Sequence, residues 1–174
     1  MKIKEVINAL EKFAPLPLQE TYDNAGLQVG LTEAEISGAL LCLDVTEQVV
    51  AEAVNLGCNL IVSHHPLLFH PLRQLSDSSM VERCVRAAVK NDICIYAAHT
   101  NMDKALDGVN FRIAEKLGLV DVQMLSPRLI DGIVSGLGVI GYLPVGEDSI
   151  QFLQRVKQAF ACECLLDNEP LERP

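Results

Sequence analysis

Apolar runs and amphipathic stripes alternate along the first two thirds of this chain, and this alternation restricts the fold more than any other feature of the sequence. Expected strands and helices follow one another over residues 36–43, 46–57, 59–62, 80–91, 93–98 and 109–118. Strands separated by helices pair in parallel, and strands that are apolar throughout are covered on both faces. We therefore predict an α/β fold: a largely parallel mixed sheet flanked by helices in three α/β/α layers.

Both ends of the chain differ from this pattern. Residues 3–13 carry apolar side chains at helical spacing and are expected to form an amphipathic opening helix. The last third contains a glycine-rich strand over 132–143, a helix over 152–160 and the apolar fragment Cys164–Leu166. This resembles a strand-helix unit that lacks its later strands. We expect an α/β domain over 1–125 and the truncated, incomplete start of a second one over 126–174.

Composition and charge narrow the class of function. No apolar run reaches the ~18 residues that span a bilayer, and a charged opening helix is not a signal peptide, so a cytoplasmic protein with no membrane partner is expected. The net charge is −9, and the 14 lysines and arginines are scattered along the chain. Nucleic-acid binding needs a concentrated basic face. Small-molecule substrates are therefore favoured over nucleic acid.

The six cysteines do not form a metal-binding pattern of paired thiols. They lie in apolar runs or helical stripes with no CxxC pair, which is typical of reduced core thiols in a protein without a secretory signal. Cys162-Glu-Cys164 has ligand-like spacing but no second thiol pair to complete a tetrahedral zinc site. We expect no metal at these two cysteines.

Histidines stand instead at the ends of two predicted strands. His64 and His65 close the run 59–63, and His99 closes the run 93–98, with Asp103 shortly after it. Open α/β sheets build their sites from side chains at neighbouring strand ends. Successive strand residues point to opposite faces, so the adjacent histidines converge only if the strand ends there, as Pro66 indicates. Each could then serve a different ion, with Asp103 bridging two cations held about 3.5–4 Å apart to activate a water.

Other polar residues in these loops have simpler interpretations. His70 is expected to be a hydrogen-bonded surface histidine. Asp44 is interpreted as an acid at a helix start in preference to a group that supports a metal ligand. Asp23 and Asn24 are typical of a turn.

Three separated motifs resemble one known family. DNAGLQVG at 23–30, LIVSHHPL at 60–67 and HTNMDKALDGVN at 99–110 are similar, in this order, to the Nif-three-like family, whose members are labelled GTP cyclohydrolase 1 type 2 homologs. The resemblance implies a dinuclear metal centre, and His64, His65 and Asp103 match its ligands. His99 falls at a motif position near the metals, with direct coordination less certain. The resemblance also implies a toroidal homohexamer.

One departure from the family pattern concerns the ligands. The family completes its centre with a histidine and a glutamate from a C-terminal segment, whereas no histidine follows His99 here. Weakened or partial metal occupancy is therefore expected.

Two functions remain open at this point. The first is a dinuclear metal-dependent hydrolase acting on a small, nucleotide-like substrate, and the alternative is a non-catalytic metal-binding or protein-interaction module. The chain has no Walker-type phosphate loop and no arginine cluster, which weakens nucleotide specificity. Histidine and carboxylate donors suit zinc, iron, manganese or nickel, so the residues do not select among these metals.

Overall fold

A computed structural model describes residues 1–163 of the protein. The chain forms two compact units. The first unit comprises Met1–Ala105, and the second begins at Leu106. The domain boundary predicted near residue 125 falls inside a strand of the second unit and stays a prediction. The fragment Cys164–Leu166 and the tail after it lie outside the described residues.

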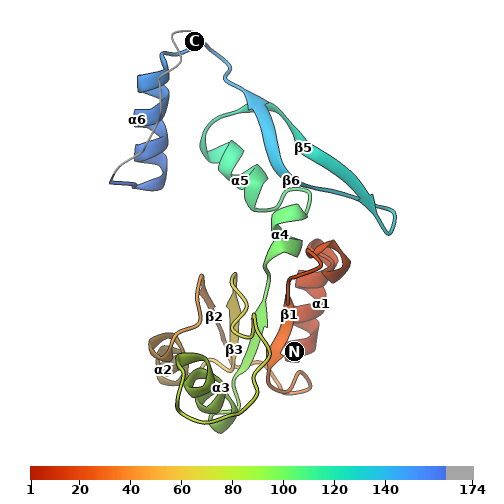
Figure 1. The fold of residues 1–174 in the computed structure, drawn as a ribbon, viewed down its shortest axis with the longest axis vertical. Helices are drawn as coiled ribbons and strands as arrows, with labels where there is room; N and C mark the ends of the chain where they lie inside the picture. The colour runs from red at the N-terminus through yellow and green to blue at the C-terminus, as the bar shows by residue number, and fades with distance from the viewer. Residues whose placement is uncertain (164–174) are drawn as a thin grey trace. The chain divides into compact units, whose positions relative to one another are not determined.

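The first unit is built on a mixed sheet of four strands (Figure 1). Its strands are β1 (Gly26–Val29), β2 (Ala39–Cys42), β3 (Leu60–Ser63) and β4 (Cys94–Ala97), in the spatial order β1-β4-β3-β2. The pairs β2–β3 and β3–β4 are parallel, and β1 runs antiparallel to β4. The predicted, largely parallel mixed sheet is therefore confirmed.

The helices of this unit begin and end where local chemistry favours it. They are α1 (Ile3–Phe13), α2 (Glu47–Leu56), α3 (Met80–Lys90) and the short α4 (Thr100–Lys104), with a 3-10 turn, η1 (Leu16–Leu18), after α1. The Thr46 side chain accepts a hydrogen bond from the Val49 amide at the start of α2, and Gly57, with φ of 67°, ends that helix. Ser79 caps α3 in the same way.

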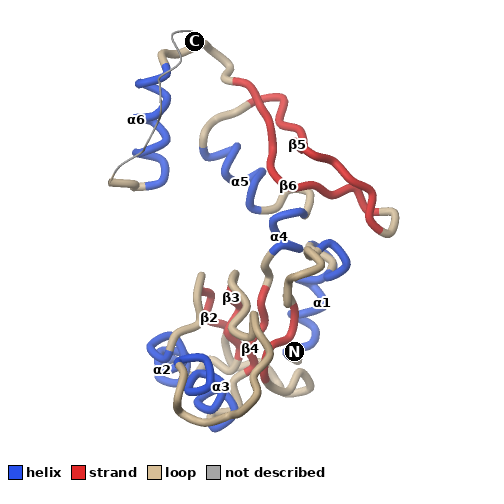
Figure 2. Tube along the Cα trace, in the orientation of Figure 1, coloured by secondary structure: helices blue, strands red, loops and turns tan. Residues whose placement is uncertain are grey.

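Alternate residues of the central strands supply two separate cores. One core joins Ile61 and Ile95 to side chains of α2 and α3, and the other joins Leu60 and Tyr96 to Ile3 and Ile7 of α1. Successive strand residues face opposite sides, so helices cover both faces of the sheet, as predicted. Figure 2 shows the four strands of this unit with α1 and the α2–α3 pair on different sides of them.

Up to residue 163, the second unit contains two helices and a two-stranded antiparallel hairpin. Its elements are α5 (Val109–Lys116), β5 (Val120–Ile130), β6 (Ile133–Tyr142) and α6 (Ser149–Phe160). β6 and α6 are the glycine-rich strand and the helix expected from the sequence, whereas β5 was not predicted. Asp148 begins α6 by accepting hydrogen bonds from the amides of Ile150 and Gln151. Among the described residues, no helix has the length and apolar character needed to cross a membrane.

Candidate metal centre

The three parallel strands end level with one another, and this brings their following residues to one edge of the sheet. Ser63, the last residue of β3, pairs with Cys42 of β2 and with Ala97 of β4. His64 and His65 follow β3 directly, and His99 lies just beyond β4. Because the strands are parallel and in register, all three histidines leave the sheet at the carboxyl edge where open α/β sheets place their sites.

The backbone turns directly after β3, as the adjacent histidines require. The His64 amide donates to the carbonyl of Cys42, the last residue of β2, at 3.2 Å, and the His65 amide donates to the carbonyl of the next residue, Leu43, at 3.0 Å. A regular parallel ladder uses alternate amides for one neighbour, so two consecutive bonds mark the end of the regular strand. The Ser63 hydroxyl also donates to the His65 carbonyl at 2.9 Å. This local turn lets two consecutive side chains approach one site.

Each of the three imidazoles is held through its Nδ1 atom. The Nδ1 of His64 lies 2.9 Å from the Ala98 carbonyl oxygen, that of His65 lies 2.8 Å from Asp44 Oδ1, and that of His99 lies 2.8 Å from Asp23 Oδ1. Carbonyl and carboxylate oxygens only accept hydrogen bonds, so each Nδ1 carries the proton. In a neutral ring this leaves the Nε2 lone pair available, which is the usual state of a metal-ligating histidine.

The donor atoms of His64, His65 and His99 converge within 4.8 Å of one another. Their ring centroids are separated by 5.0 to 5.5 Å. Two nitrogens bound to one zinc ion lie at most about 4.2 Å apart, since each bond is about 2.0–2.1 Å long. Small side-chain movements would therefore place the three donors around an ion. The sequence left His99 as the less certain member, and the structure brings it into the cluster.

Asp103 lies beside this cluster but belongs to α4. Its Oδ1 is 3.7 Å from the Nε2 of His64, and about a quarter of each side chain is exposed. Several contacts tie α4 to the first part of the chain, and two of them involve its later residues. Lys104 Nζ lies 2.7 Å from Glu20 Oε1, and Asn101 Nδ2 donates to the Ala14 carbonyl at 2.7 Å. These buried contacts set the place of Asp103 relative to the histidines, and its role as a ligand stays a prediction.

Two acidic residues hold histidines of the cluster, a role that the sequence offered only as the less favoured interpretation of Asp44 and did not indicate for Asp23. Asp44 was interpreted as a helix-start acid, but its Oδ1 contacts His65 while Thr46 caps α2. Asp23 was interpreted as a turn residue, but its side chain is fully buried and bonded to His99. Neither contact has a local sequence signal, because the partners are 21 and 76 residues apart.

Asp23 is ionised in this environment. Burial alone would raise its pKa, but hydrogen bonds from His99 and Thr100 and from the backbone amides of Asn24 and Thr100 together outweigh burial, and the pKa lies below its usual value. The carboxylate therefore accepts all of these hydrogen bonds.

The remaining predicted residues lie apart from the cluster. The ring of His70 packs against Phe69, with 5.1 Å between centroids, and is not among the converging donors. Cys162 also lies outside the converging donors, and Cys164 is outside the described residues. The five described cysteines are free thiols, and burial raises the pKa of Cys94 to about 11. Cys84 and Cys94 are buried as expected of core side chains, whereas Cys42, Cys58 and Cys162 are partly exposed.

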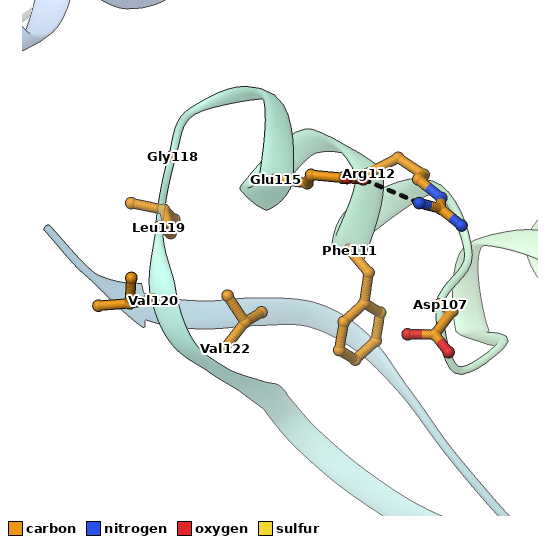
Figure 3. Close-up of a pocket in the computed structure, with 8 residues that line it drawn as sticks. All are labelled: Asp107, Phe111, Arg112, Glu115, Gly118, Leu119, Val120 and Val122. Carbon is orange, nitrogen blue, oxygen red and sulfur yellow. Dashed lines mark hydrogen bonds and ion pairs between the residues drawn. The ribbon is translucent and has the colours of Figure 1, made fainter. Parts of the chain in front are cut away.

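The second unit has a hollow of a different character between α5 and the start of β5 (Figure 3). It is lined by Asp107, Phe111, Arg112, Glu115, Gly118, Leu119, Val120 and Val122. Its arginine is paired with Glu115 at 2.8 Å, and both side chains are about 70% exposed. The hollow offers no group of metal ligands among the described residues.

Comparison with known proteins gives a consistent set of relatives. The chain is 32% identical over 165 residues to a "GTP cyclohydrolase 1 type 2 homolog" of Clostridium acetobutylicum, covering 95% of this chain and 62% of the relative. It is 36% identical to the protein of the same description from Lactococcus lactis, with the same coverage. The solved structure of a Bacillus cereus protein related to NIF3 superposes with a TM-score of 0.85 and 26% identity, covering 92% of this chain and 70% of that one.

These relatives are longer than this chain, which spans about 62% of the length of the two curated proteins. The family model described as Duf34/NIF3 (NGG1p interacting factor 3) matches residues 1–171. This match covers the sheet, the histidine cluster and the hairpin, and it agrees with the resemblance carried by the three motifs. The chain belongs to the Duf34/NIF3 family.

Proposed function

We propose that this chain binds divalent metal at the cluster of His64, His65 and His99, with Asp103 as a further ligand. The observation that carries the proposal is the shared orientation of the three imidazoles: each Nδ1 is held by an oxygen, and the donor atoms converge within 4.8 Å. Ordinary surface histidines have no reason to be anchored in this common way. Nitrogen and carboxylate donors suit zinc, iron, manganese or nickel.

The proposal includes two ions in the complete site. His64 and His65 leave the end of β3 side by side, and Asp103, next to His64, offers two oxygens that can bridge cations. The resemblance implies two more ligands, a histidine and a glutamate, and this sequence has no histidine after His99. We therefore expect the 174-residue chain to hold metal more weakly, or at lower occupancy, than a version that supplies them.

We further propose a hydrolytic reaction on a small, nucleotide-like substrate. A divalent ion at this site would act as a Lewis acid and lower the pKa of a water molecule. The protein's own groups would bind and orient: Asp44 and Asp23 hold His65 and His99 in place, and half of the His65 side chain faces solvent. The relatives are described as GTP cyclohydrolase 1 type 2 homologs, which supports a nucleotide-like substrate. A net charge of −9 supports a small molecule over nucleic acid.

Cellular location and assembly are also proposals. The family resemblance supports a homohexamer, which light scattering after size-exclusion chromatography would measure directly. A cytoplasmic location is also proposed, and the free thiols of the described cysteines support it.

The first experiment measures metal per chain by elemental mass spectrometry after desalting. The double variant His64→Ala/Asp103→Ala should lose metal while keeping its secondary structure by circular dichroism, and His70→Ala is the matched control that should keep metal. The same measurement on a version extended beyond Pro174 tests whether later residues raise the content toward two. Equal metal content in the wild type and the double variant would overturn the site.

A second experiment separates catalysis from binding. The metal-loaded protein is incubated with GTP and with simple phosphate esters, and product formation is followed by chromatography. Turnover that disappears in the double variant supports the hydrolase. Metal binding without turnover on any of these compounds would favour the non-catalytic module instead.

A further inference from the structure

The three histidines of the cluster are not anchored in equivalent ways. His64 is held by the Ala98 carbonyl of the neighbouring strand end, and His65 by Asp44, which is largely exposed. His99 is held by Asp23, whose side chain is fully buried and which lies 76 residues earlier in the sequence. Only this anchor is both charged and shielded from water, so it acts most strongly on its imidazole.

Asp23 uses both carboxylate oxygens at the start of α4. Oδ1 accepts from His99 Nδ1 at 2.8 Å and from the Asn24 amide at 2.7 Å, and Oδ2 accepts from the Thr100 amide at 3.1 Å and from the Thr100 hydroxyl. The Thr100 oxygen in turn accepts from the Glu20 amide at 2.9 Å. Each carboxylate oxygen therefore faces a backbone amide that can only donate, and the two oxygens of an aspartate satisfy both positions.

The same short segment also holds the loop that follows His65. Asn24 Nδ2 donates to the Leu68 carbonyl at 2.7 Å, and the Leu68 amide donates to Gln28 Oε1 at 3.0 Å. Residues 23–28 therefore bond to both loops that carry the histidines. This segment connects the two strand ends independently of the sheet hydrogen bonds.

We propose that Asp23 is a positioning residue that holds His99 in the Nδ1–H tautomer and directs its Nε2 lone pair into the cluster. The metal-binding consequence rests on the function proposed above, whereas the tautomer does not. His99 thus has its donor atom ready before any ligand arrives. A site whose ligands are already oriented loses less freedom on binding, and loss of such supporting contacts typically weakens metal affinity about 10–100-fold.

Alanine at position 23 would remove both carboxylate oxygens that these donors use. His99 Nδ1 would then lose the acceptor that holds its proton, and Asp23 would no longer fix the tautomer of the ring. In the Ser-His-Asp triad, loss of the aspartate's acceptor role likewise leaves the histidine in the wrong tautomer.

The test is a two-bond ¹H–¹⁵N correlation spectrum of the histidine rings in metal-free protein. The spectrum is recorded at a pH about two units above the ordinary histidine pKa of about 6.5, where the rings are neutral. We expect the wild-type His99 to show the Nδ1–H pattern. Asp23→Ala should reduce the share of the Nδ1–H pattern at His99, and the matched control Asp44→Ala should leave His99 unchanged. A wild-type His99 with its proton on Nε2 would overturn the proposal even if the Asp23 variant did not fold.

Zinc titration by calorimetry then tests the consequence for the cluster. Asp23→Ala should weaken zinc binding about 10–100-fold relative to wild type, with His70→Ala unchanged. Unaltered affinity together with an altered tautomer would refute the role of Asp23 in presenting His99 to metal. Absence of zinc binding in the wild type would instead count against the proposed function, and the tautomer spectrum would still decide whether Asp23 sets the state of His99.

Discussion

Replacement of Gly30 by alanine should loosen the pairing of β1 with β4, at the end of these strands away from the candidate centre. Gly30 directly follows β1, has a φ of +104° and lies against the start of β4. An added Cβ would lie 2.6 Å from the Cys94 Cα and 3.0 Å from the Ile93 carbonyl oxygen. Both atoms belong to the backbone, so rotation of a side chain cannot relieve the overlap.

The cost has two parts, and Gly57→Ala isolates one of them. A positive φ costs an L-residue about 1–2 kcal/mol, and overpacking against fixed atoms adds about 1–3 kcal/mol. Gly30→Ala should therefore lower the free energy of unfolding by about 2–5 kcal/mol. Gly57 has a φ of +67° but no atom within 4 Å of its added Cβ, so Gly57→Ala should carry only the first part.

Urea unfolding followed by far-ultraviolet circular dichroism compares the two variants with wild type. The midpoint should fall further for Gly30→Ala than for Gly57→Ala, with similar slopes if the same surface becomes exposed. Equal midpoints for the two alanine variants would refute the close approach of Gly30 to β4. Such a result would also argue against tight packing of the end of β1 on the start of β4.

Three further predictions concern the core, the pH dependence and the metal. Ile61→Ala should lower the free energy of unfolding by about 2–5 kcal/mol because Ile61 is fully buried. Leu41 is 76% exposed, so Leu41→Ala should change the free energy of unfolding by less than about 0.5 kcal/mol. Equal urea midpoints for the two variants would contradict the assigned core. Hydrogen bonds from Ser76 lower the pKa of Glu82 to about 2, so its carboxylate stabilises the fold above its usual pKa of about 4.3 and this stabilisation is lost as pH falls toward 2. Glu82→Gln should therefore be less stable than wild type at neutral pH, with a difference that shrinks on acidification in thermal melts, and a pH-independent difference would argue against this. Chelator-treated protein should gain about 2.7 kcal/mol when zinc is added to 100 times its dissociation constant, and an unchanged melting temperature would contradict metal binding to the native state.

The alternation of apolar runs and helical stripes was enough to predict most of the first unit. The expected strands and the helix after residue 80 match β3, β4 and α3 closely. Apart from Ser63, the two strands have no small polar or charged side chain, a pattern that arises when helices cover both faces of a parallel sheet. Local capping residues such as Thr46 and Gly57 were also readable, because each acts on its own helix end.

Elements with weak local signals were missed. β5 alternates apolar and polar residues only over 120–124 and then contains Pro127, and it is a strand because its residues pair with β6 along most of its length. α4 is only five residues long, too short for a helical stripe to be recognised. The antiparallel placement of β1 beside β4 depends on contacts between residues about 70 positions apart, as in the pair Gly26 and Ala97.

For the candidate centre, the sequence by itself determined which imidazoles stand at strand ends. His64, His65 and His99 could be identified as a group because parallel strands deliver their carboxyl ends to one edge. Only the tertiary structure decided how each ring is held, since Asp44 and Asp23 reach their histidines across 21 and 76 residues. Periodicity describes neighbours along the chain, whereas a hydrogen bond between distant segments exists only after the sheet has brought them together.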